Sequence, residues 1–246
     1  MSVLTQSGRL APRTRRIIKG VLFTAPWIIG LLALYAYPIV TSFYWTFTDY
    51  RIMNPPTWVG LNNYRSLAGD PSVRKSLSNT LIYAGMWLPS SLIVSLLLAM
   101  LLNSDIRGMA FYRALYYFPV LVPTVASAIV WKWVLDPQWG IMNHILRTVG
   151  LPTLGWIGSP TWAKPSMVLI GLWGAGNTVV IYLASLQDVP RSLYDAAEVD
   201  GANAIQKAMH VTIPMITPVI FFNMIMGLIG SFQTFALPYV ITNGNG

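Results

Sequence analysis

The chain has 246 residues, of which 54% are hydrophobic and only 10% are charged, with a net charge of +8 and no cysteine. A soluble domain usually carries about 25% charged residues, so this composition indicates an integral membrane protein. The lack of cysteine excludes disulfides, thiolate catalysis and cysteine-based metal sites. We interpret the basic excess as a signal that holds loops on the cytoplasmic side, and not as a nucleic-acid interface.

Five apolar segments are long enough to cross a membrane as helices, which takes about 20 residues. In chain order they are residues 21–47, 77–102, 114–135, 165–186 and 213–237. Prolines inside them, such as Pro38, Pro119 and Pro123, remove backbone donors and are expected to bend the helices. The first span is too long for a cleaved signal peptide and is interpreted as a signal anchor. The sequence therefore predicts an all-α, polytopic membrane protein.

The distribution of Lys and Arg predicts the orientation of the spans. With the N-terminus inside, the basic cluster that precedes the first span faces the cytoplasm and outweighs the other basic residues. This cluster consists of Arg9, Arg13, Arg15, Arg16 and Lys19. We predict a cytoplasmic basic tail over residues 1–20 and a transmembrane domain over residues 21–246. Loops 48–76 and 136–164 are then outside, and the segment at about 190–212 is cytoplasmic.

Several chemical motifs are absent from the sequence. No Asp, Glu or His lies within the five spans, which disfavours an ion-coupled carrier. There is no P-loop for ATP, and there is no H-E-x-x-H or G-x-S-x-G motif. We therefore expect no enzyme activity, metal or cofactor in this chain.

The predicted cytoplasmic segment carries recognisable helix signals. Ser192 is expected to cap a short helix, with Asp195 completing a capping box, and Gly201 is expected to end it in a left-handed conformation. A second short helix over residues 202–210 would lead back into the membrane at Pro214. From spacing alone, an ordinary amphipathic connector between two spans remains an equal interpretation.

The same segment resembles the EAA loop of binding-protein-dependent ABC importer permeases. Asp195 stands at the leading Glu of that motif and keeps its charge, while Gly201 keeps its spacing. Ala208 and Met209 stand where aromatic residues are common, which is a departure. The resemblance implies an ATPase-coupling set made of Asp195, Ala196, Ala197, Asp200, Gly201, Ala202 and Pro214.

Other stretches resemble the carbohydrate permeases, in particular the first (MalF-like) of the two paired permeases of maltose-type sugar transporters. They are Pro56 to Tyr64, Asn79-Thr80, Phe111 to Ala114 and Leu237 to Gly244. The resemblance covers residues from about 20 to 246 and implies the type I ABC importer transmembrane fold. Since that fold has six spans, we expect a sixth span after Gly246.

The resemblance also implies an assembly in a bacterial-type cytoplasmic membrane. The expected partners are a second permease, two ATP-binding cassette subunits that hold ATP and Mg, and an extracytoplasmic solute-binding protein. Closure of the ATPase dimer would move the loop and alternate access to a central site.

The lack of charge in the spans fits a neutral, sugar-like solute. The resemblance places its contacts at Trp173, Gly174 and Asn177 on one face of the fourth span, and at Ser231, Gln233 and Thr234 on the fifth. Hydrogen bonding between helices is the alternative role for each of these residues. A secondary carrier of an uncharged solute, a glycerol-phosphate-type ABC permease and a non-transporting membrane scaffold remain open.

Overall fold

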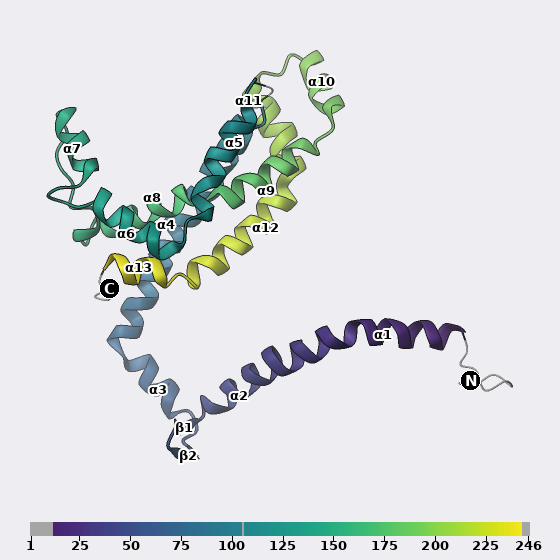
Figure 1. Cartoon of the computed structure of the whole chain (residues 1–246), viewed down its shortest axis with the longest axis vertical. Coiled ribbons are helices and arrows are strands. Elements are labelled where there is room, and N and C mark those ends of the chain that lie inside the picture. Colours follow the sequence, from purple (N-terminus) through teal and green to yellow (C-terminus); the bar gives the residue numbers. More distant parts are fainter. Residues whose placement is uncertain (1–11, 105, 243–246) are drawn as a thin grey trace. The chain divides into compact units, whose positions relative to one another are not determined.

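The computed structural model describes residues 12–104 and 106–242. The chain divides into two compact units, Met1–Lys75 and Ser76–Gly246, and each is described by itself (Figure 1). Arg9 of the predicted basic cluster and the C-terminal end at Asn243 and Gly244 lie outside the described residues.

The first unit contains an apolar helical run, a β-hairpin and a short helix. Its elements are α1 (Pro12–Leu31), the π-helical turn η1 (Leu32–Ala36), α2 (Tyr37–Trp45), β1 (Thr48–Arg51), β2 (Asn54–Trp58) and α3 (Asn62–Gly69). The run from Arg13 to Trp45 is long and apolar enough to cross a membrane, so the first span begins inside the predicted tail. The π turn η1 lies just before Pro38. Because proline has no N–H, it cannot donate the usual helical hydrogen bond to the carbonyl oxygen of Leu34.

The β-hairpin replaces what the sequence predicted only as a loop. β1 and β2 pair antiparallel, and Trp58 stacks on Phe47 with ring centroids 5.5 Å apart. The Asn63 side chain donates to the carbonyl oxygens of Thr46 and Thr48, at 2.9 Å each. These contacts make the segment after the first span an ordered module.

The second unit is helical and begins within the long helix α4 (Pro71–Leu102). The following elements are α5 (Met109–Tyr117), η2 (Phe118–Leu121), α6 (Thr124–Val134), α7 (Ile141–Thr148), η3 (Trp156–Gly158), α8 (Ala163–Trp173), α9 (Gly176–Gln187), α10 (Arg191–Val199), α11 (Ala204–Lys207), η4 (Ala208–Thr212), α12 (Ile213–Phe232) and α13 (Ala236–Ile241).

Two of the predicted spans are broken in the structure. The described residues contain three continuous helices that are long and apolar enough to cross a membrane, or up to five spans if each bent pair is one. The third predicted span, residues 114–135, is not a single helix, because the helical segments Met109–Leu121 and Thr124–Val134 meet at an angle of 100°. Pro123 occupies the N-cap of α6, where it prevents the preceding turn from continuing. The fourth is bent by 50° at Gly174 and Ala175.

Two buried clusters hold the second unit together. In the first, Tyr182 and Leu186 of α9 pack with Ala99 of α4 and Ile216 of α12. Ser95 and Ala99 are fully buried, and their small side chains let the helices approach closely, as is common in membranes. The second cluster joins α6, α8, η3 and α13.

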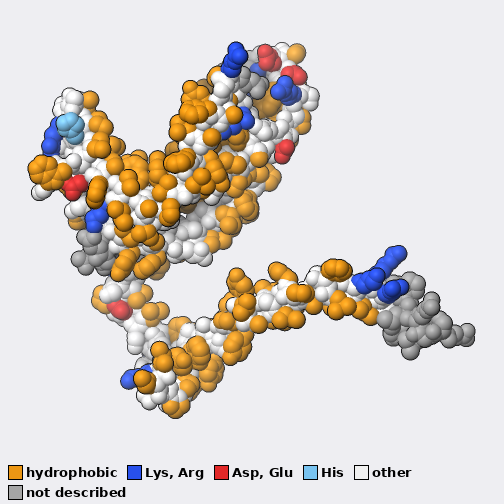
Figure 2. Space-filling model, in the orientation of Figure 1, with side chains coloured by type: hydrophobic (Ala, Val, Ile, Leu, Met, Phe, Trp, Pro, Cys, Tyr) orange, Lys and Arg blue, Asp and Glu red, His pale blue; other side chains and the backbone are white. Residues whose placement is uncertain are grey.

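Most other apolar side chains lie on the surface. Figure 2 shows them covering the described helices, with Lys and Arg gathered at the beginning of α1. No part of the apolar window of the first span is buried. Such a surface suits a hydrocarbon environment, where apolar side chains need no burial.

The connection from α6 to α8 is folded around Asn143, which is 1% exposed. Its amide nitrogen donates to the carbonyl oxygens of Pro137 and Leu154, at 2.9 Å each. Its amide oxygen accepts from the Leu154 N–H at 3.0 Å and from Trp156 Nε1 at 2.8 Å. One side chain therefore satisfies four polar groups of the segment.

Replacing Asn143 with alanine should open this segment locally. The four partner groups would lose their bonds, and each buried unsatisfied group costs about 1–3 kcal/mol. We expect faster proteolysis between residues 136 and 164 in the membrane-embedded protein. His144→Ala, on the exposed side of the same helix, is the control. Equal cleavage rates for both variants would contradict the structural role of Asn143.

Candidate transport pocket and coupling segment

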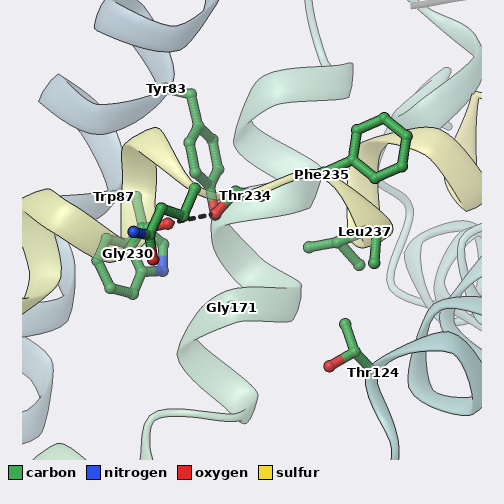
Figure 3. Close-up of a pocket in the computed structure, with 10 residues that line it drawn as sticks. Tyr83, Trp87, Thr124, Gly171, Gly230, Thr234, Phe235 and Leu237 are labelled. Carbon is green, nitrogen blue, oxygen red and sulfur yellow. Dashed lines mark hydrogen bonds between the residues drawn. The ribbon is translucent and has the colours of Figure 1, made fainter. Parts of the chain in front are cut away.

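A cavity of about 420 Å³ lies within the second unit, where five helices contribute to its wall. Its lining consists of Tyr83, Trp87, Thr124, Gly171, Gly230, Gln233, Thr234, Phe235, Ala236 and Leu237. Figure 3 shows the two aromatic side chains of α4 near the C-terminal end of α12 and the turn that follows it. Residues far apart in the sequence thus meet at one concave, mostly apolar site.

Two glycines make room for Trp87. A Cβ at Gly171 of α8 would lie 2.5 Å from Trp87 Nε1, and one at Gly227 of α12 would lie 3.3 Å from Trp87 Cζ3. Tyr83, one turn earlier on α4, is stacked with Trp87 at a centroid distance of 6.5 Å. The indole is therefore held between α8 and α12 and forms a fixed part of the cavity wall.

The polar side of the cavity comes from the end of α12. The helix ends at Phe232, and the Gln233 N–H bonds back to the carbonyl oxygens of Ile229 and Gly230. Thr234 Oγ1 donates to the Gly230 carbonyl oxygen at 2.9 Å, drawn in Figure 3, so its lone pairs stay available to accept. An amide and a hydroxyl thus line one wall.

Of the six predicted solute contacts, the structure places only Gln233 and Thr234 on this cavity. Ser231 is buried and donates to the Leu228 carbonyl oxygen of its own helix at 2.7 Å. Trp173 packs edge-on against Trp131, with ring centroids 5.9 Å apart.

The predicted common face of Trp173, Gly174 and Asn177 is wrong, because α8 ends at Trp173 and Asn177 belongs to α9 beyond the 50° bend. Conversely, the sequence reasoning missed Tyr83, Trp87 and Thr124. Of these three, only Tyr83 and Trp87 could have been noticed in the sequence, because two aromatic residues four positions apart lie on one face of a helix.

The predicted coupling segment forms a helix with a well-defined end. The Gly201 N–H bonds to the Glu198 carbonyl oxygen at 3.0 Å, and the Ala202 N–H bonds to that of Ala197 at 2.9 Å. These two bonds form a Schellman motif, in which the first residue after the helix cap, here Gly201, adopts a left-handed conformation. Gly201 has φ +75, which confirms the predicted left-handed cap.

The predicted capping at the other end is wrong. The helix α10 begins at Arg191, with Pro190 in the N-cap position, so Ser192 already lies within the helix. The second helix also begins later than predicted, at Ala204, where Asn203 and Gln206 form the capping box. It continues through the π turn η4 into α12, so Pro214 lies in the first turn of α12.

Most of the predicted coupling residues lie on the surface of this segment. Asp195, Ala196, Asp200 and Gly201 are exposed, whereas Ala197 and Ala202 are half-buried. The apolar side chains of Val199 and Ile205 are 88% and 75% exposed. The segment therefore presents small, acidic and apolar groups that are available to a partner.

Two side-chain contacts connect α10 with α11 and η4, the elements that lead into α12. Lys207 Nζ donates a hydrogen bond to Glu198 Oε2 at 2.8 Å. This hydrogen bond and the positive charge of Lys207 lower the pKa of Glu198. The Tyr194 hydroxyl lies 2.9 Å from the buried Thr212 Oγ1. Both contacts tie α10 to the helical run that continues through η4 into α12.

Known proteins resemble this chain along nearly its whole length. Residues 66–246 match the family model described as binding-protein-dependent transport system inner membrane component. The chain is 36% identical to the probable ABC transporter permease protein YesP of Bacillus subtilis (strain 168), over 99% of this chain and 81% of that protein. It is 33% identical to the arabinooligosaccharides transport system permease protein AraP of the same organism, over 91% and 72% of the two chains.

A solved structure shares the fold. It is the crystal structure of a bacterial ABC transporter involved in the import of the acidic polysaccharide alginate, with a TM-score of 0.76 at 23% identity. The match covers 94% of this chain and 83% of that one. The family resemblance seen in the EAA-like loop is confirmed by the family model and by the relatives: the chain belongs to the family of inner membrane components of binding-protein-dependent transport systems and is an ABC importer permease.

Proposed function

We propose that this permease carries a neutral carbohydrate through the cavity beside Trp87. The supporting observation is the chemistry of the lining, since none of the ten described residues around the cavity carries a charge. A phosphate or carboxylate would lose its hydration there without a compensating cation. Aromatic walls with an amide and a hydroxyl suit a hydroxyl-rich ring. The name of the relative AraP, an arabinooligosaccharide permease, points to the same solute class.

The proposed assembly has three kinds of protein partner. A second permease would complete the translocation path, two ATPase subunits would hold ATP and Mg, and a solute-binding protein would deliver the sugar. The basic residues Arg13, Arg15 and Arg16 at the start of α1 support a cytoplasmic N-terminus. The ATPase would then dock on α10 and its left-handed end at Gly201.

The test of this function is reconstitution of the whole transporter in vesicles. Uptake should require ATP, a P-loop ATPase that co-purifies with the chain, and the binding protein. Uptake without the ATPase would instead support a secondary carrier, and no flux of any solute would support a scaffold. An anionic ligand recovered from the binding protein would contradict the neutral solute.

Replacing Gln233 with alanine should weaken solute use without affecting assembly. Loss of one hydrogen bond to the solute, on the order of 1.4 kcal/mol, raises the half-saturating solute concentration about tenfold. The measurement is uptake against solute concentration. Asn177→Ala, an exposed position outside the cavity, is the matched comparison. If only Asn177→Ala weakened uptake, the solute site would lie at the α8–α9 bend instead.

A further inference from the structure

The short helix α7 has three distinct faces. Met142 and Leu146 pack against the cluster of α6, α8 and α13, next to the buried Asn143. Beside them runs an exposed apolar stripe, made of Ile141 and Ile145 of α7 and of Val149, which caps the C-terminal end of the helix. These side chains are 61%, 50% and 63% exposed. The third face carries His144, Arg147 and Thr148, all exposed.

The orientation of α7 is fixed by its attachment to α6. Asp136, just after α6, accepts hydrogen bonds from the N–H groups of Gln138 and Trp139, at 2.8 Å each. A Cβ at Gly140 would overlap the backbone of Asp136, so the chain turns there in close contact with itself. Together with the four bonds of Asn143, this tight connection holds the stripe on the outside of the unit.

We propose that α7 lies in the boundary between lipid headgroups and acyl chains, with the stripe of Ile141, Ile145 and Val149 against the acyl chains. The helix α7 follows α6 in the chain after a short connection, and α6 is the last part of a bent pair that is apolar enough to span a membrane. Trp133 and Trp139, 78% and 87% exposed, flank the connection, and Trp is enriched at this depth of a bilayer.

The remaining faces of α7 agree with an interfacial position. Its inner face packs on the protein, the stripe is left for lipid, and the third face carries Arg147 for water and lipid phosphates. An apolar stripe beside a basic polar face is the pattern of helices that lie in the plane of a membrane surface. Arg147 is the charged residue of α7, and its guanidinium can pair with lipid phosphates.

The absence of native cysteine allows a direct test. Single cysteines at Ile145→Cys and Arg147→Cys, on the stripe and on the polar face, would carry a nitroxide label in the assembled transporter in phospholipid nanodiscs. Electron paramagnetic resonance measures label accessibility to oxygen, which partitions into lipid, and to a water-soluble nickel chelate. We expect a several-fold higher oxygen-to-nickel ratio at position 145 than at position 147.

Other outcomes would overturn the proposal. Protection of position 145 from both reagents would show that a protein partner covers the stripe. High nickel accessibility at both positions would place α7 in water. Because the label reports position and not transport, the result does not depend on the proposed solute or on ATP.

Discussion

Replacing Gly201 with leucine should remove ATP-driven uptake while the protein remains inserted in the membrane. Gly201 has φ +75, a conformation that costs a residue with a Cβ about 1–2 kcal/mol. The two Schellman bonds at the end of α10 depend on that conformation. Because the position is exposed and lies outside the helices that could span a membrane, the strain changes the shape of α10 and not the insertion of the bundle.

The control for this prediction is Gly201→Asn, since asparagine tolerates the left-handed region. It should keep most of the uptake, measured in proteoliposomes together with ATPase co-purification and ATP hydrolysis. Asp195→Lys tests docking separately, because it reverses an exposed charge in α10 without straining the backbone. We expect weakened ATPase association or uncoupled hydrolysis in both disruptive variants. Normal transport by both would leave the segment as an ordinary connector.

Replacing Gly171 with alanine should lower the apparent affinity for solute tenfold or more. The added Cβ would lie 2.5 Å from Trp87 Nε1, so the indole or the helix must shift. On the other side of the ring, a Cβ at Gly227 of α12 would lie 3.3 Å from Trp87 Cζ3 and 2.7 Å from Leu88 Cδ1, so the indole has little room to move toward α12. Forcing a group into such a packed site costs about 1–3 kcal/mol, and here the displaced ring is part of the cavity wall.

Gly85→Ala is the matched control on α4, because a Cβ there meets nothing within 4 Å. Both variants should insert and associate with the ATPase. Only Gly171→Ala should require more solute for half-maximal uptake. Unchanged uptake in Gly171→Ala would show that the position of Trp87 does not shape the solute site.

The sequence determines the features that depend on local chemistry. Hydropathy located the apolar segments, because a helix must match the thickness of the membrane whatever its neighbours are. The Asp195-Ala196-Ala197 run and Gly201 predicted the coupling segment, and the left-handed cap is confirmed because few residues other than glycine adopt that conformation readily. The family followed from the same motif.

The tertiary structure decides what depends on neighbours. The helices continue through Pro89 and Pro218, yet the chain turns by 100° where Pro119 and Pro123 occur together. The bend after Gly174 separates residues that a continuous helix would place on one face. Trp87 lines a cavity because glycines of α8 and α12 leave space for its ring, and spacing along one chain cannot show which helices will meet.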